Sequence, residues 1–428
     1  MTWWNLISAT GILAILAAAW LLSLERKRID PRTICWGVGL QLILGFLVFV
    51  FPPGKQVFLL VNDAVVHVLS YAREGAEFVF GNLAIPPGEE GSMGFYFAFQ
   101  ALTAVIFFAA IVGLLYHVGI MPRVVAALAR VFTRLMRVSG AEAVCLSSNI
   151  FVGIESALTV RPFLRRMTRS ELCLVLTGGM ATIASTVLAM YVLILRPHFP
   201  EIAGHLVSAT VLSAPAALVM AKMLVPETDE PETFGRDVKP VQEKRHNWIE
   251  AVTSGSMDGF QLATGIAAVL IAFLGLLALV NGFTGWAGSW FGFPQLTLQA
   301  IAAYGFYPFV FLMGVPLADV PGVAELLGLR LFATEIPAYR DLAAALDADA
   351  ISHRSAVIAA YSLCGFAHVA SMGIFIGGIA ALEPSRAKDL GAVGPRALLA
   401  ATFACLMTGA VAGIFATDDL VLLEQALR

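Results

Sequence analysis

The sequence predicts an all-α integral membrane protein, with eight transmembrane helices and two re-entrant helical hairpins of opposite orientation. Three observations predict this class. Apolar residues make up 59% of the 428 residues and charged residues only 13%, whereas soluble globular chains carry about 25% charged residues. The apolar residues gather in stretches of about 20, the length that crosses a bilayer. Two further apolar connections are interrupted by Gly or Pro. An ordinary soluble enzyme is therefore excluded.

The predicted spans follow one another along the chain. They lie near residues 3–24, 33–52, 95–119, 170–194, 201–224, 250–281, 350–381 and 396–416. The first lacks a basic leader and a terminal A-x-A cleavage site, so we expect a retained helix and not a removed signal peptide. The five cysteines fall in or beside apolar segments without CxxC spacing, which favours small core residues over disulfides or zinc ligands.

The basic residues predict the orientation of the spans, because cytoplasmic loops carry an excess of Lys and Arg. If the spans alternate, 19 of the 27 Lys and Arg residues lie in connections on one side. The opposite side holds Lys55, Arg73, Arg196, Arg330, Arg340, Arg354 and Arg428. We therefore expect a multi-pass protein of the plasma (inner) membrane with both termini outside the cytoplasm. The net charge of −3 and the scattered basic residues argue against nucleic-acid binding.

Two connections, 140–167 and 314–342, are too apolar for ordinary loops. Each is typical of two short helices joined by a break that enters the membrane and returns. Such backbone is tolerated at membrane depth only when it is buried in protein or faces a wet cavity. A pair of interrupted segments in corresponding halves of a chain indicates a transporter site.

The two halves of the chain resemble each other. The run RSELCLVLTGGMATIAS at 169–185 aligns with RSAVIAAYSLCGFAHVAS at 354–371, and a glutamate, Glu155 or Glu335, precedes each run. The amphipathic stretch 122–138 corresponds to 295–313. Because the first copy starts from a cytoplasmic connection and the second from an external one, we expect inverted repeats. The expected organisation is N-terminal scaffold spans with an external amphipathic segment (1–94), a first repeat with hairpin 1 (95–225), a cytoplasmic linker (226–249) and a second repeat with hairpin 2 (250–428).

Three polar side chains in apolar surroundings are candidates for chemistry. Glu155 and Glu335 lie in the two interrupted segments, where a carboxylate is costly unless it is paired, protonated or in contact with water. The alternative is a carboxylate that reaches the membrane interface from a shallow loop. His368 lies in the middle of the seventh span, where a substrate or proton role competes with a structural one. Phe366 is either a core residue or a stacking face.

The span centres that carry ATIAS and FAHVAS are rich in Ser, Thr and Gly, as discontinuous helices require. Freed carbonyls and a hydroxyl at such breaks can surround a hard cation such as Na⁺. Asn149, Val152, Thr182 and Ile183 are the candidates, although any Ser- and Thr-rich kink gives the same pattern. No HExxH, GxSxG or P-loop motif occurs, so we expect no enzyme, no cofactor and no ATP-driven pump, but secondary transport.

At these residues the chain resembles the concentrative nucleoside transporter family. The resemblance covers nearly the whole length, and its motifs occur in the family's order. They are NIFVGIESALTVRPFL, GGMATIASTVL, LVSATVLSAPAALVMAKMLVPET, LQAIAAYGFYPFVFLMGVP, TEIPAY and CGFAHVASMGIFIGGIAAL. The resemblance implies a homotrimer in which each protomer has eight spans, two hairpins and its own site, and which moves a nucleoside with Na⁺ or, in some members, H⁺.

The resemblance also implies roles for particular residues. Glu335 and Ser371 would hold the ribose hydroxyls, with Phe366 and His368 close by. The tip of hairpin 1 would face the base. The Na⁺ shell would consist of the carbonyls of Asn149, Val152 and Ile183 and the hydroxyl of Thr182. The complete substrate set implied in this way is Gly153, Ile154, Glu155, Ser156, Val187, Glu335, Phe366, His368 and Ser371.

The departures from the family pattern concern substrate choice. Where the family has Gly-Gln-Thr/Ser-Glu at the tip of hairpin 1, this chain has Gly153, Ile154, Glu155 and Ser156. Two family asparagines are replaced, by His368 and by Thr334. We therefore expect an altered range of ribosyl substrates. The alternatives are a proton-coupled transporter of a modified nucleoside or other polar solute, and a non-transporting membrane receptor that keeps the fold.

Overall fold

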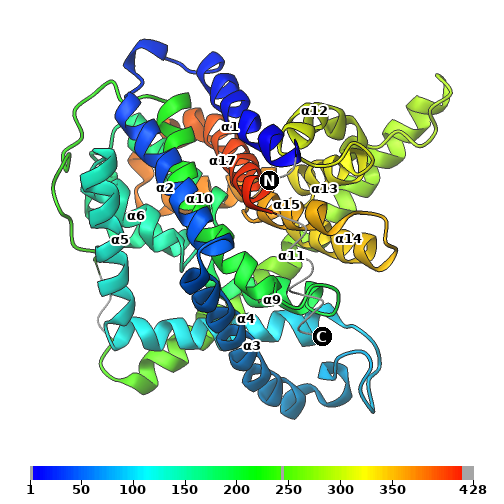
Figure 1. Cartoon of the computed structure of the whole chain (residues 1–428). Coiled ribbons are helices and arrows are strands. Elements are labelled where there is room, and N and C mark those ends of the chain that lie inside the picture. Colours follow the sequence, from blue (N-terminus) through cyan, green and yellow to red (C-terminus); the bar gives the residue numbers. More distant parts are fainter. Residues whose placement is uncertain (1–2, 242–244, 417–428) are drawn as a thin grey trace.

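The computed structural model describes residues 3–241 and 245–416, except for the side chain of Ile154. In these residues the chain is helical, which confirms the predicted all-α class (Figure 1). The end of the second repeat beyond residue 416 lies outside the described part. The N-terminal segment contains α1 (Trp3–Leu21), η1 (Arg26–Arg28), α2 (Pro31–Phe49), α3 (Pro52–Phe80) and η2 (Gly81–Ala84).

The helices of the two halves follow in the same order, as an internal repeat requires. The first half contains α4 (Phe97–His117), α5 (Ile120–Met136), α6 (Gly140–Asn149), η3 (Ile154–Val160), α7 (Arg161–Leu164), α8 (Arg169–Ala181), α9 (Ser185–Leu195) and α10 (Ile202–Leu224). The second contains α11 (Trp248–Ser289), α12 (Leu298–Leu312), α13 (Val320–Phe332), α14 (Glu335–Asp347), α15 (His353–Leu363), α16 (Val369–Leu382), η4 (Pro384–Arg386) and α17 (Ala387–Phe415). The segments 140–167 and 314–342 both form a pair of short helices.

Within the described residues, seven helical segments are long and apolar enough to cross a membrane. The seventh predicted span, 350–381, is divided into α15 and α16 by a break at 364–368. The span 170–194 is similarly interrupted at 182–184, between α8 and α9. The two Ser-, Thr- and Gly-rich centres are therefore the places where the helices break.

The long helices differ in how deeply they lie in the molecule. Of the span-forming part of α10, 83% is buried, against 17% for α11. Helices α10 and α17 lie against each other at the centre of the molecule (Figure 1). Helices α4 and α11 pack closely at Gly255, which has no Cβ atom. A Cβ atom added there would lie only 2.7 Å from the carbonyl oxygen of Ala109. Small residues permit such approach between membrane helices.

The base of each hairpin is fastened to the helix that follows it. In the first half, the hydroxyl of Ser139 donates to Glu171 Oε1 at 2.6 Å. In the second, Asp319 Oδ2 accepts from the amide of Ser352 at 3.0 Å and from the hydroxyl of Ser355 at 2.5 Å. Burial opposes ionisation of Asp319, but the hydrogen bonds outweigh it and lower the pKa of the carboxyl. An acid and a hydroxyl thus join corresponding elements in both halves.

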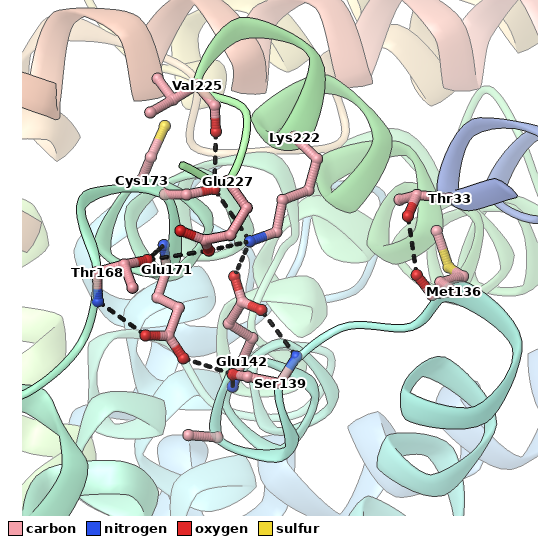
Figure 2. A network of polar contacts seen from close by, with 12 residues as sticks. Thr33, Met136, Ser139, Glu142, Thr168, Glu171, Cys173, Lys222, Val225 and Glu227 are labelled. Carbon is pink, nitrogen blue, oxygen red and sulfur yellow. Dashed lines mark hydrogen bonds and ion pairs between the residues drawn. The ribbon is translucent and has the colours of Figure 1, made fainter. Parts of the chain in front are cut away.

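Lys222, near the end of α10, is the centre of a polar network at the base of hairpin 1 (Figure 2). Its ammonium group forms ion pairs with the fully buried Glu142 and, at 3.2 Å, with Glu227. It also donates to the hydroxyl of Ser170 at 3.0 Å. Because Glu142 belongs to α6 and Ser170 to α8, a single amine connects hairpin 1, α8, α10 and the linker.

Replacement of Lys222 by methionine is expected to lower the free energy of unfolding by about 3–5 kcal/mol, because buried carboxylates lose their cationic partner. Denaturation of the purified protein in mixed detergent micelles measures this. Arg166→Met is the matched control: its ion pair with Glu232 is exposed, and exposed pairs contribute about 0–1 kcal/mol. Equal losses in both variants would contradict the structural role of the network.

The linker after α10 is connected to hairpin 1 by backbone hydrogen bonds. The carbonyl oxygen of Thr233 accepts from the amide of Gly140 at 2.9 Å, and the amide of Val241 donates to the carbonyl of Thr159 at 3.0 Å. Asp237 lies 3.6 Å from Arg130 of α5. The linker therefore follows the edge of the molecule beside α5 (Figure 1).

Two arginines that the sequence places in external connections have structural partners. Arg354 donates to the carbonyl oxygens of Gly314 at 2.9 Å and Gly413 at 2.7 Å. Arg330 is completely buried. An apolar helix that contains one arginine does not reveal whether the side chain reaches solvent or turns inward. Both side chains are therefore held by the protein itself, and the side of the membrane on which they lie stays a prediction.

Candidate functional site

A cavity of about 330 Å³ lies where the tips of both hairpins, the two helix breaks and α11 meet. It combines residues that are far apart in the sequence. Seven of the nine predicted substrate residues line it: Gly153, Glu155, Val187, Glu335, Phe366, His368 and Ser371. Residues of both halves of the chain therefore contribute to one chamber.

Glu335 is the most deeply buried acid of this chamber, with 2% of its surface exposed. It begins α14, directly after the N-cap residue Thr334. Its Oε1 accepts a hydrogen bond from the hydroxyl of Tyr191 at 2.5 Å. Its Oε2 lies 3.1 Å from Nε2 of His368 but has no aligned hydrogen bond among the described residues. One carboxylate oxygen is thus left with unused acceptor capacity.

His368 is the N-cap residue of α16, and this position determines its tautomer. Its Nδ1 accepts a hydrogen bond from the backbone amide of Ser371 at 3.1 Å. An accepting Nδ1 carries no proton, so the network assigns the hydrogen of the neutral ring to Nε2, which faces Glu335. The hydroxyl of Ser371 reaches the carbonyl of His368 at 2.7 Å. The cap thereby holds both side chains at the wall of the cavity.

The tip of hairpin 1 is only partly directed at the cavity. Glu155 is exposed and lines the wall. Ser156, which we expected beside it, is instead buried and donates to Asn149 Oδ1 at 2.8 Å. The side chain of Ile154 lies outside the described part of the structure. A 3-10 segment, η3, follows Gly153 and directs Ser156 towards Asn149 instead of the chamber.

A second cavity, of about 700 Å³, continues from the first. Gly153, Glu155, Gln261 and Leu262 line both. The second cavity extends towards Arg161 and towards Val241 and Arg245 of the linker region. The chamber therefore communicates with the face of the molecule that carries the linker.

The four predicted cation ligands lie where α6 and α8 end. The hydroxyl of Thr182 lies 3.1 Å from the carbonyl oxygen of Asn149, which joins the two helix ends. Thr182, Asn149 and Ile183 are buried. Among the described residues, no backbone amide donates to the carbonyls of Val152 or Ile183. Unpaired carbonyls and a hydroxyl at helix ends fit a hard cation such as Na⁺.

Two residues at the site were missed by the sequence reasoning. Tyr191, which contacts Glu335, lies in an apolar span where a single tyrosine gives no pattern. Gln261 lies on α11 and lines both cavities. A signal existed for Gln261, because an amide inside the predicted span 250–281 is costly in lipid unless it faces protein or water.

Three family models together match most of the chain. Residues 10–83 match "Na+ dependent nucleoside transporter N-terminus", residues 98–197 match "Nucleoside recognition", and residues 205–413 match "Na+ dependent nucleoside transporter C-terminus".

Individual relatives of the chain are also transporters by name. Solute carrier family 28 member 3 of Rattus norvegicus is 38% identical, and the match covers 96% of this chain and 58% of that protein. A Haemophilus influenzae protein named "Uncharacterized transporter" is 37% identical, and the match covers 96% of this chain and 97% of that protein. Sodium/nucleoside cotransporter 2 of Rattus norvegicus is 36% identical, with 96% and 62% covered. The chain thus spans about three fifths of the mammalian relatives.

Solved structures of one transporter, CNTnw, share the fold. Its inward-facing substrate-bound state matches with a TM-score of 0.87 and 34% identity over 96% of this chain and 97% of that one. An outward-facing variant of CNTnw matches equally well, with a TM-score of 0.87 over 97% and 98% of the two chains. With its helix order, its chamber and these relatives, the chain belongs to the concentrative nucleoside transporter family.

Proposed function

We propose that this chain is a secondary active symporter, not an enzyme, that imports a nucleoside or nucleoside-like solute driven by a Na⁺ gradient. One observation carries the proposal. Glu335 Oε2 lacks an aligned hydrogen bond at the wall of a cavity that Ser371 and Phe366 also line. Buried polar groups need partners, and a ribose offers two neighbouring hydroxyl donors. An aromatic ring beside them suits a base.

Recognition of the base is expected to differ from that in the family pattern. The amide that the pattern has at the tip of hairpin 1 is replaced by Ile154. Gln261 lines the same cavity as Glu155, and its carboxamide offers both a donor and an acceptor. We therefore propose that α11 supplies the amide that hairpin 1 lacks, and that the substrate range shifts accordingly.

Sodium is favoured as the coupling ion over the proton. The oxygens around Thr182 suit a hard cation, as described above. The Nδ1 atom of His368 is already engaged as the acceptor of the Ser371 amide, so the geometry gives this ring a capping role. Glu155, which is exposed to both cavities, remains the strongest proton site and supports the proton-coupled alternative.

Transport is proposed to follow an elevator mechanism in a homotrimer of the plasma (inner) membrane, with both termini outside the cytoplasm. The chamber lies between the hairpins and α11, so displacement of the hairpin-bearing elements along α11 would carry the substrate. The second cavity opens towards the linker, which the basic residues place in the cytoplasm. The described conformation then corresponds to a chamber open to the inside.

Uptake into liposomes tests the proposed function. The full chain is reconstituted, and accumulation of radiolabelled purine and pyrimidine nucleosides is measured under an inward Na⁺ gradient, a pH gradient, or neither. We expect accumulation of at least one nucleoside with Na⁺ alone. Uptake that follows the pH gradient and ignores Na⁺ would favour proton coupling. No accumulation of any member would favour a receptor that keeps the fold.

A further inference from the structure

Arg330 carries a charge in the interior without an acidic partner. Its surface is 0% exposed. One guanidinium nitrogen, Nη1, donates to the carbonyl oxygen of Ser362. Among the residues that the structure describes, Nε and Nη2 have no hydrogen-bond partner, and no carboxylate forms an ion pair with Arg330. A buried charge needs compensation, so some other negative potential must stabilise this guanidinium.

Two helix ends supply that potential. Arg330 lies in the last turn of α13, and Ser362 lies in the last turn of α15, which ends at Leu363. The C-terminus of a helix is equivalent to about half a negative elementary charge. Two such ends amount to about one negative charge, which a single guanidinium neutralises. The positive charge of Arg330 therefore neutralises the two helix ends where hairpin 2 meets the break at 364–368.

The first repeat brings together the corresponding helix ends without a fixed charge. There α6 ends at Asn149 and α8 at Ala181, and neither last turn contains a basic residue. Counted back from the end of its helix, the position of Arg330 corresponds to Ser147. This serine is 0% exposed, and its hydroxyl has no partner among the described residues. The first repeat is thus left with two negative helix ends and neutral oxygens.

We propose that Arg330 is a built-in cation that occupies, in the second repeat, the place that the first repeat leaves for a cation from solution. The inference rests on the sodium site of the proposed function. Arg330 acts as a positioning residue: it holds hairpin 2, and with it Glu335, against the break that presents His368. It also limits the chain to one bound Na⁺, because the second pair of helix ends is already neutralised.

The number of bound ions tests this proposal without any nucleoside. A ligand that binds only the native state stabilises it in proportion to the logarithm of its concentration, once per site. The unfolding free energy of the purified full chain in detergent is measured against Na⁺ concentration, with choline keeping the ionic strength constant. Arg330→Ser gives the second repeat the side chain that Ser147 provides in the first. Arg330→Lys is the matched control that keeps the charge.

The slope of the unfolding free energy against the logarithm of the Na⁺ concentration is expected to correspond to one bound ion for the wild type and for Arg330→Lys. For Arg330→Ser it is expected to correspond to two bound ions. The same slope in all three proteins would overturn the proposal. The wild-type slope itself tests sodium binding, whereas the difference between Arg330→Ser and the wild type tests the role of Arg330, so the two failures are distinguishable.

A reciprocal variant covers the case in which Arg330→Ser does not fold. Ser147→Lys places a fixed charge at the corresponding position of the first repeat. We expect its stability to be independent of Na⁺, with a slope of zero. A folded Ser147→Lys protein that keeps the one-ion slope would also overturn the proposal.

Discussion

Replacement of Glu335 by glutamine is expected to reduce concentrative nucleoside uptake by roughly 100-fold, since hydrogen bonds to a charged group contribute about 1.5–3 kcal/mol each. The amide keeps the size of the side chain but replaces one carboxylate oxygen by a donor. The oxygen that lacks an aligned hydrogen bond, Oε2, lies 3.1 Å from His368 Nε2. A donor at that place would oppose both the ring N–H and a substrate hydroxyl.

Initial uptake rates in liposomes under a Na⁺ gradient measure this effect. Glu325→Gln is the matched control, because Glu325 lies on the exposed face of the same hairpin and undergoes the same chemical change. The control is expected to retain the wild-type rate. Substantial uptake by Glu335→Gln, at a normal level of folded protein, would remove Glu335 from the proposed substrate site.

The second large effect is expected for Thr182→Val, which removes a hydroxyl from the proposed cation shell. The substitution keeps the shape of the side chain but leaves a methyl group between the ends of α6 and α8. Loss of about 1.4 kcal/mol of cation binding raises the half-saturating Na⁺ concentration about tenfold. The dependence of uptake on Na⁺ concentration, at a fixed nucleoside concentration, provides the measurement.

Thr177→Val controls for the loss of a buried hydroxyl on the same helix. Thr177 is 0% exposed and contacts Ala397 at 3.4 Å, away from the break. Its half-saturating Na⁺ concentration is expected to stay at the wild-type value. If both variants shift that concentration equally, the hydroxyl of Thr182 acts through stability, and the cation shell must lie elsewhere.

Apolar length and helix breakers were sufficient to predict where the helices run. A stretch of about 20 apolar residues has few alternatives in a membrane, and the two interrupted segments became helix pairs where the sequence placed them. The polar centres ATIAS and FAHVAS coincide with the breaks at 182–184 and 364–368. The exact division of the span 350–381 depended on the cap formed by His368, which hydropathy does not reveal.

The structure brings the predicted residues with a high cost of burial to the wall of one cavity. Glu335 and His368 lie together because only a shared polar chamber makes their burial acceptable. Ser156 could not be assigned, because a small hydroxyl is satisfied equally well by the side chain of Asn149 or by a ligand. Tyr191 and Arg330 were not identified for a related reason: their partners come from helices far away in the sequence.

In the proposed elevator mechanism, the hydrogen bond between Val241 and Thr159 limits how far hairpin 1 can move. Helix α11 begins at Trp248, seven residues after Val241. A fully extended chain covers at most about 3.6 Å per residue, so Val241 and Trp248 can lie at most about 25 Å apart. As long as that bond persists, the proposed movement of hairpin 1 relative to the start of α11 is limited to the distance that this number of residues can cover.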